Sequence, residues 1–174
     1  SNAGSSVGIT KCQTKTEIFS AIRLALTVDD RIIAEEGLSN LREIEVSVMG
    51  NDSSDIDCGL VGRVKSAKEV YDYDSKYNDP NSSNILPADI GEDLRRKIAD
   101  IAKRAYCACN CKGLARVDFF LTDDDKIYIN EINTLPGFTS ISMYPMAFAK
   151  KGVSYSEMLD RLLNLAVKEH LKNE

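Results

Sequence analysis

The sequence lacks any run of the roughly 18 apolar residues that a membrane-spanning helix requires. Its first residues show no basic and apolar secretion signal, and it contains no internal repeat or low-complexity tract. Basic residues are not in excess, since 22 Lys and Arg stand against 27 Asp and Glu. The net charge of −5 gives the chain as a whole no electrostatic reason to bind nucleic acid. The remaining composition, 43% hydrophobic and 28% charged, is typical of a folded globular domain.

Five cysteines are an odd number, and a chain of 174 residues is too long to need disulfide staples. A reducing cytoplasm is therefore the expected compartment. Ser1-Asn2-Ala3 reads as the scar of a cleaved tag. Without it, the sequence begins abruptly at Gly4, inside what resembles a functional loop, and we expect the chain to be a fragment.

Hydrophobic periodicity predicts alternating helices and strands. The capping-box pattern from Thr14 to Glu17 predicts a helix that ends near residue 29, and Ser154 to Glu157 predicts a second one ending near residue 170. A third helix is expected over 89–110, with strands at 31–36, 43–49, 113–121 and 126–132 and one or two more within 58–71. Residues 72–89 read as a long polar loop. The pattern favours an α+β fold, a mostly antiparallel sheet with helices on one face.

The strongest chemical signal lies on the two strands predicted at 113–121 and 126–132. A four-residue turn between them sets a register in which Arg116 lies opposite Glu131, with Asp118 diagonal to it. Strand parity then collects four side chains on one face of the sheet: Arg116, Asp118, Glu131 and Asn133.

Two carboxylates, an amide oxygen and a guanidinium in one place suit a magnesium–phosphate site. Mg²⁺ prefers oxygen ligands and usually keeps waters or substrate phosphates as its other ligands. The arginine would stabilise negative charge that develops beside the metal. From spacing alone, a solvated polar strand face with a cross-strand salt bridge remains an open alternative.

Three further segments fit nucleotide binding, and each has an ordinary alternative. The Gly/Ser run at 4–8 would let backbone N–H groups approach phosphate oxygens, or it is a plain turn. Lys76 in the polar loop would close over a phosphate, or it is an ordinary exposed lysine. Residues 35–38 and 42–43, Glu-Glu-Gly-Leu and Arg-Glu, would pair with a planar base and bind ribose hydroxyls, or they form a solvated acidic turn.

Taken together, these motifs resemble the D-alanine–D-alanine ligases of the ATP-grasp superfamily, from Gly4 essentially to the end of the chain. The resemblance is carried by five segments in the same order: Gly-Ser-Ser-Val-Gly at 4–8, Arg-Glu-Ile-Glu-Val at 42–46, Tyr-Asp-Tyr-Asp-Ser-Lys-Tyr at 71–77, Gly-Leu-Ala-Arg-Val-Asp-Phe-Phe at 113–120 and Ile-Asn-Glu-Ile-Asn-Thr-Leu-Pro-Gly-Phe-Thr at 129–139.

The resemblance implies an ATP-dependent ligase that phosphorylates one D-alanine and joins it to a second for peptidoglycan synthesis. It implies that Asp118, Glu131 and Asn133 bind two Mg²⁺ ions, with Mn²⁺ as a substitute, and that Ser6 and Lys76 contact the γ-phosphate of ATP. The implied partners are ATP and D-alanine, with no nucleic acid and no membrane, and a homodimer for the full-length protein.

The resemblance also implies roles around the reacting carbonyl. Arg116 and the backbone N–H of Gly137 would stabilise the tetrahedral oxyanion, and Ser142 would hold the carboxylate of the second substrate. Ser5 and Tyr77 would belong to a hydrogen-bonded cluster that closes the long loop. The adenosine site would be lined by four residues: Glu35, Glu36, Leu38 and Glu43.

Family members are usually about twice as long, with an additional N-terminal domain. The resemblance therefore implies a truncated small ATP-grasp lobe over 4–37 and a large C-terminal lobe over 38–174, and a fragment that is inactive alone. The second substrate stays open among D-alanine, D-serine and D-lactate, although Tyr77 resembles the D-alanine type. A module that only binds nucleotide or oligomerises is the remaining alternative.

Overall fold

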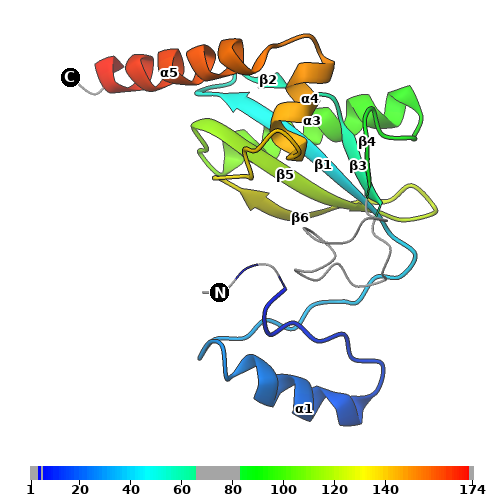
Figure 1. Ribbon diagram of the computed structural model, residues 1–174. Helices are drawn as coiled ribbons and strands as arrows, with labels where there is room; N and C mark the ends of the chain where they lie inside the picture. The colour runs from blue at the N-terminus through cyan, green and yellow to red at the C-terminus, as the bar shows by residue number, and fades with distance from the viewer. Residues whose placement is uncertain (1–3, 5, 66–82, 173–174) are drawn as a thin grey trace. The chain divides into compact units, whose positions relative to one another are not determined.

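The computed structural model describes residues 4, 6–65 and 83–172 (Figure 1). Ser5 and most of the polar loop predicted at 72–89, including Lys76 and Tyr77, lie outside the described residues. The chain divides into two compact units, Ser1–Asn40 with Ser66–Ser83, and Leu41–Lys65 with Asn84–Glu174. We describe each unit separately.

The first unit contains one described helix, α1 (Lys15–Ala25), which starts at Thr14 as predicted. The Glu17 carboxylate accepts hydrogen bonds from the backbone N–H groups of Gln13 at 2.7 Å and Thr14 at 3.2 Å. These bonds lower the pKa of Glu17 because they stabilise the charged carboxylate. The predicted capping box is confirmed.

The strand predicted at 31–36 is wrong, because these residues have no regular secondary structure. A strand requires a neighbour with which to exchange backbone hydrogen bonds, and no described strand pairs with this segment. Its apolar side chains are accordingly accessible, with Ile32 41% and Ile33 77% exposed.

The second unit is organised on a sheet with the order β4-β3-β1-β5-β6, in which β2 pairs with β1 off this path (Figure 1). β1 runs antiparallel to β2, β3 and β5, and β5 runs antiparallel to β6. The strands predicted at 43–49, 113–121 and 126–132 are thereby confirmed. Their bounds are β1 Arg42–Gly50, β2 Asp57–Cys58, β3 Gly62–Lys65, β4 Ser83–Ile85, β5 Gly113–Leu121 and β6 Ile127–Asn133.

One face of this sheet packs against α3 (Glu92–Ala108), which confirms the helix predicted over 89–110. Alternate residues of β1, among them Ile44 and Val46, point to this face together with Val117 and Phe119 of β5. They meet a buried stripe on the helix made of three residues: Ile98, Ala102 and Tyr106. This is the larger of the two apolar clusters and fixes the positions of β1 and β5.

Two further helices, α4 (Met143–Lys150) and α5 (Tyr155–Lys172), pack against the opposite face near the end of β1 (Figure 1). Met49 belongs to their cluster, and strand alternation directs it away from Val48, which belongs to the α3 cluster. The prediction that the helices lie on one face is therefore wrong. No helix was predicted over the residues that form α4.

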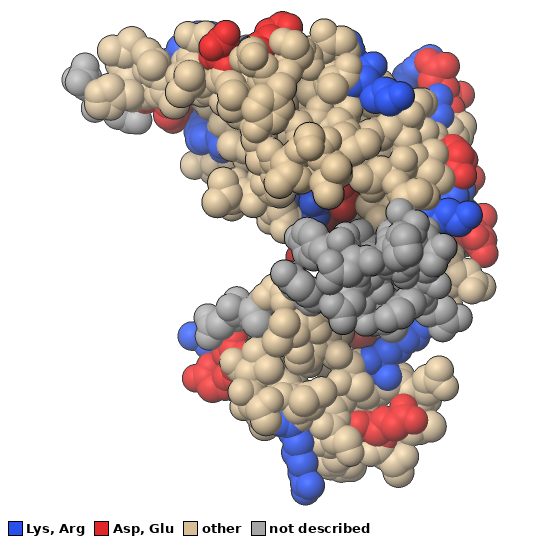
Figure 2. All heavy atoms as spheres, viewed as in Figure 1, with Lys and Arg blue, Asp and Glu red and all other residues tan. Residues whose placement is uncertain are grey.

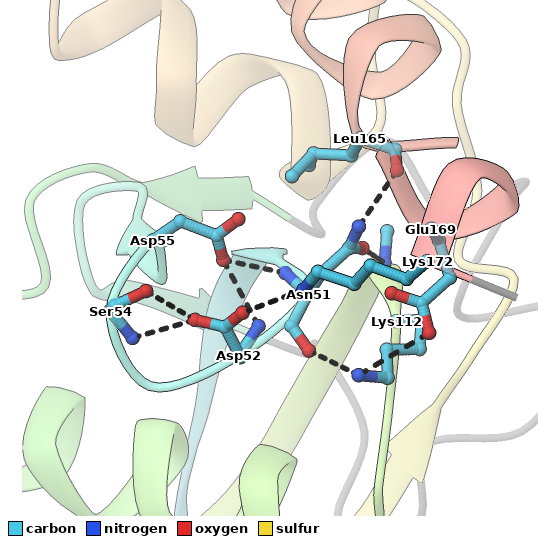
Figure 3. Close-up of polar contacts among 9 residues, drawn as sticks. Asn51, Asp52, Ser54, Asp55, Lys112, Leu165, Glu169 and Lys172 are labelled. Carbon is cyan, nitrogen blue, oxygen red and sulfur yellow. Dashed lines mark hydrogen bonds and ion pairs between the residues drawn. The ribbon is translucent and has the colours of Figure 1, made fainter. Parts of the chain in front are cut away.

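Asn51, the residue directly after β1, joins α5 to the sheet and is 4% exposed (Figure 3). Its side-chain amide donates to the carbonyl of Leu165 at 2.7 Å and accepts from the backbone N–H of Gly113 at 3.1 Å. Lys112 donates to the Asn51 carbonyl at 2.6 Å and pairs with Glu169 at 3.6 Å. One buried amide therefore links the end of β1, the start of β5 and α5.

Replacing Asn51 by alanine should lower the free energy of unfolding by about 1–3 kcal/mol, because the part-buried Gly113 N–H would lose its acceptor and the Leu165 carbonyl would lose a hydrogen bond at a buried position. Urea unfolding followed by circular dichroism measures this. Ser54→Ala is the matched control, since its hydroxyl bonds Asp52 in the same turn but at an exposed position, and it should cost less than about 1 kcal/mol. Equal losses for both variants would contradict the role given to Asn51.

The surface of the described residues mixes charges of both signs. On the face seen in Figure 2, acidic and basic side chains stand close to one another. Surface ion pairs include Arg63–Asp89 at 2.7 Å and Lys172–Asp52 at 3.1 Å. No helix within the described ranges is long and apolar enough to cross a membrane.

Candidate nucleotide and metal site

A β-bulge determines which side chains of β6 share a face with Asp118. The pairing shifts by one residue between Asp118 and Phe119, so that Asp118 lies opposite Glu131, while Phe119 lies opposite Ile129. Without this extra residue, Asp118 would face Asn130, and Glu131 would point to the α3 side. The bulge therefore turns Glu131 and, two residues later, Asn133 toward Asp118.

The predicted register was wrong, yet its conclusion about the shared face is confirmed. The turn leaves Leu121 opposite Ile127 rather than Lys126, and the bulge adds a second shift of one residue. Two shifts of one residue restore the parity of the strand. Arg116 consequently lies opposite Asn133 rather than Glu131, and all four predicted side chains still lie on one face.

These side chains form a connected hydrogen-bond network. Arg116 donates to both oxygens of Asp118, from Nε to Oδ1 and from Nη2 to Oδ2, each at 2.7 Å. The Asn133 amide donates to Asp118 Oδ2 at 2.9 Å and to Glu131 Oε1 at 3.3 Å. Asp118 is thus the centre of the cluster.

The cluster is partly buried at its centre and open at Glu131. The side chains of Arg116 and Asp118 are 17% and 12% exposed, whereas Glu131 is exposed. Burial alone would lower the pKa of Arg116, but the hydrogen bond with Asp118 and the nearby carboxylates of Glu45, Asp118 and Glu131 outweigh it and raise this pKa. Arg116 is therefore a permanent positive charge among three carboxylates.

Gly137 and Ser142, two other predicted catalytic residues of this unit, lie close together in the loop after β6. A Cβ atom built on Gly137 would lie 3.0 Å from Ser142 Oγ. Ser142 is the residue before α4, and its hydroxyl accepts a hydrogen bond from the backbone N–H of Thr139 at 3.1 Å. Glycine at 137 therefore leaves room for the Ser142 hydroxyl.

The remaining predicted residues are divided between the two units. Glu43 is half-buried on β1 in the second unit. In the first unit, Glu35 and Glu36 are exposed and Leu38 is half-buried, all within a segment without regular structure. Ser6 lies in a turn with a left-handed φ of 60°, and its predicted contact with phosphate stays a prediction.

The donor set suits a magnesium–phosphate site better than a closed metal cage. Within the described parts of the chain, no group of three or more His, Cys, Asp or Glu side chains is arranged to hold a metal ion. Asp118, Glu131 and Asn133 offer two carboxylates and an amide instead. This set fits Mg²⁺, which usually takes one or two protein carboxylates and completes its shell with water and phosphate.

Glu45, a buried residue of the cluster, was not predicted from the sequence as a site residue. Glu45 on β1 lies opposite Asp118 across the strand pair and is 8% exposed. Strand alternation places it on the same face as Glu43. A charged residue inside an otherwise buried strand was the available signal, and it indicates a polar cluster on that face.

Comparison with known proteins shows the family to which the chain belongs. A D-alanine–D-alanine ligase of Macrococcus caseolyticus is 47% identical over 173 residues, which cover 99% of this chain and 48% of that protein. The solved structure of the D-alanine–D-alanine ligase from Coxiella burnetii matches with a TM-score of 0.83 and 35% identity, over 98% of this chain and 44% of that one. The VanG D-Ala:D-Ser ligase from Enterococcus faecalis matches with a TM-score of 0.82 and 39% identity, over 93% and 46%.

The fold of the chain is that of the ATP-grasp C-terminal domain, which confirms the predicted ATP-grasp fold with a mostly antiparallel sheet. The model of the D-ala D-ala ligase C-terminus matches residues 1–164, and the chain belongs to this family. The chain spans about half the length of the curated relatives it matches, 48% for the protein from Macrococcus caseolyticus.

Proposed function

We propose that this chain is the nucleotide- and metal-binding part of an ATP-dependent ligase that joins two D-alanines for peptidoglycan synthesis. The observation that carries the proposal is the bulge-dependent cluster of Arg116, Asp118, Glu131 and Asn133, found in a chain of this family. In the reaction, ATP phosphorylates the carboxylate of the first D-alanine. The amine of the second then attacks the acyl carbon, and phosphate leaves.

The oxygens of Asp118, Glu131 and Asn133 would hold two Mg²⁺ ions, which neutralise charge on the ATP phosphates when bound. Half a turn of the Asn133 amide would present Oδ1 in place of the Nδ2 that now donates to Asp118. Ser6 and Lys76 would contact the γ-phosphate. Glu35, Glu36, Leu38 and Glu43 would line the adenosine site.

Arg116 and the backbone N–H of Gly137 would stabilise the negative oxygen of the tetrahedral intermediate. A guanidinium suits this role because it stays charged throughout the reaction. Ser142 would hold the carboxylate of the second substrate, and its position beside Gly137 supports placing both on one side of the reacting carbonyl. Ser5 and Tyr77 would belong to the hydrogen-bonded cluster that orients this substrate.

D-serine is the second candidate for the attacking substrate. The VanG D-Ala:D-Ser ligase is 39% identical to this chain, between the 35% of the D-alanine–D-alanine ligase from Coxiella burnetii and the 47% of that from Macrococcus caseolyticus. Tyr77 in the segment at 71–77 favours D-alanine over D-lactate. The two amino acids differ by one hydroxyl, so the choice depends on the pocket around Ser142.

Within the full-length protein, we propose a small lobe over 4–37 and a large lobe over 38–174, a homodimer, and a cytoplasmic location where ATP is supplied. By itself, the chain would bind nucleotide weakly and make no dipeptide. Positioning two substrates supplies about 7–11 kcal/mol of a barrier, and a chain that spans half the length of its relatives would forfeit much of this contribution.

The experiment is an ADP-release assay on the full-length protein with Mg²⁺ and ATP. D-alanine, D-serine and D-lactate are supplied singly and in pairs, and the dipeptide is identified by mass spectrometry. We expect release that requires D-alanine and yields D-alanyl-D-alanine. A product that contains D-serine would select the second candidate, and release independent of every D-substrate would overturn the ligase proposal.

A further inference from the structure

Glu45 is the one acidic residue of the cluster to which the proposed reaction gives no role. Its carboxylate lies on β1, 3.3 Å from Arg116 Nε, and its side chain is 11% exposed. It faces Asp118 across the strand pair, so that two carboxylates contact one guanidinium. Like charges directly opposite each other are unfavourable in a sheet, and Arg116 offsets their repulsion.

Arg116 therefore has two possible ion-pair partners, the carboxylates of Glu45 and Asp118. Its shorter contacts go to Asp118, at 2.7 Å from both Nε and Nη2, and the longer one goes to Glu45 at 3.3 Å. The same Asp118 oxygens would have to bind a metal ion. A cation at Asp118 consequently competes with the Arg116 guanidinium for the same carboxylate.

The charge of the cluster shows what Glu45 adds. Glu45, Asp118 and Glu131 carry three negative charges and Arg116 one positive charge, which leaves a net charge of −2. A net charge of −2 attracts divalent cations more strongly than a net charge of −1 does. Without Glu45, the net charge would be −1, and Asp118 alone would neutralise Arg116.

We propose that Glu45 is a positioning residue that holds Arg116 on the β1 side, so that the Asp118 oxygens are released to bind the metal ion. This role rests on the proposed function, because it assumes that Asp118 is a metal ligand. Glu45 itself contacts neither metal nor substrate. It acts through Arg116, in the way that residues behind a metal ligand tune metal affinity.

The test is the binding of Mn²⁺ to this chain, followed by the loss of the free-ion signal in electron paramagnetic resonance. Glu45→Gln should raise the Mn²⁺ dissociation constant by about tenfold or more, as changes behind a metal ligand do. Ser47→Ala is the matched control, since Ser47 is the next residue of β1 on the same face, is buried, and has a hydroxyl without a hydrogen-bond partner. It should bind Mn²⁺ as the unchanged chain does.

The double variant Glu45→Gln with Arg116→Gln separates this role from a structural one. It removes the competing guanidinium and restores a net charge of −2, so its Mn²⁺ affinity should return toward that of the unchanged chain. A structural defect from losing Glu45 would not be repaired by a second substitution. Should Glu45→Gln fail to fold, the double variant carries the test, because it leaves only the Asp118 carboxylate without the guanidinium, and Asp118 keeps its hydrogen bond from Asn133.

The outcomes distinguish the two levels of the proposal. Mn²⁺ binding that Glu45→Gln leaves unchanged would overturn the role of Glu45 and leave the proposed function standing. A double variant that binds as weakly as the single one would also overturn this role. No binding by the unchanged chain would overturn the metal site of the proposed function and, with it, the role of Glu45.

Discussion

Replacing Glu131 by glutamine in the full-length protein should lower turnover by about 10²–10³-fold. The change removes one of the two carboxylates proposed to hold the metal ions, whose charge stabilisation is worth several kcal/mol in such sites, and each 1.36 kcal/mol is tenfold in rate. The fold should be preserved, because Glu131 is exposed and its hydrogen bond with Asn133 is replaceable by the amide of glutamine. Steady-state ADP release and circular dichroism measure the two effects.

Glu157→Gln is the control for this experiment. Glu157 is also an exposed glutamate with a single close partner, Arg161 at 2.6 Å, but it lies on α5. Its substitution should leave turnover within about twofold of the unchanged protein, since an exposed ion pair contributes less than about 1 kcal/mol. Near-normal turnover of the Glu131→Gln variant would show that Glu131 is not a metal ligand.

Arg116→Ala should reduce stability as well as turnover. It leaves the carboxylates of Glu45 and Asp118 facing each other at 11% and 12% exposure with no positive charge between them. We expect a loss of about 2–4 kcal/mol, somewhat below the cost of breaking a fully buried pair, because the arginine side chain keeps 17% exposure. Turnover should fall by about 10²–10³-fold, the usual effect of removing an oxyanion donor.

The matched control is Arg161→Ala, which also removes an arginine between two acids. Arg161 pairs with Asp57 at 3.4 Å and with Glu157 at 2.6 Å, but its side chain is 41% exposed. Solvent screening should reduce its contribution to less than about 1 kcal/mol. Urea unfolding of both variants, combined with the ADP assay, makes the comparison. Equal stability losses would contradict the electrostatic role of Arg116.

The polar cluster was predictable from the sequence because side chains along any strand alternate between the two faces of the sheet. Arg116 and Asp118 share a face whenever 113–121 is a strand, and Glu131 shares a face with Asn133 for the same reason. What the sequence could not reveal was the bulge at Asn130, since no local pattern indicates which residue is left unpaired. The prediction that the four side chains share one face was correct because the turn and the bulge each shift the register by one residue, and the two shifts together return Glu131 and Asn133 to the predicted face.

The other differences arise from contacts that are distant along the sequence. Residues 31–36 have the composition of a strand, but a strand forms only where a partner can receive its hydrogen bonds. No helix was predicted over 143–150, yet Tyr144 and Phe148 are fully buried and give this segment a helical packing face. Pro145 is tolerated there because it lies in the first turn of α4.

Glu45 was not predicted as a site residue because its place in the cluster depends on the pairing of β1 with β5. In the sequence, it is one of two acidic residues at 43–45. Only the pairing of β1 with β5 shows that it is buried and lies opposite Asp118. The roles of Lys76 and Tyr77 stay predictions, since both residues lie outside the described ranges.

The most direct measurement is anomalous X-ray diffraction from crystals of the full-length protein grown with Mn²⁺ and a non-hydrolysable ATP analogue. We predict an anomalous peak within about 2.0–2.3 Å of oxygens from Asp118, Glu131 and Asn133, with nucleotide phosphate completing the coordination. A peak at other carboxylates, or bound nucleotide with no manganese at these three residues, would contradict the metal site on which the proposed function depends.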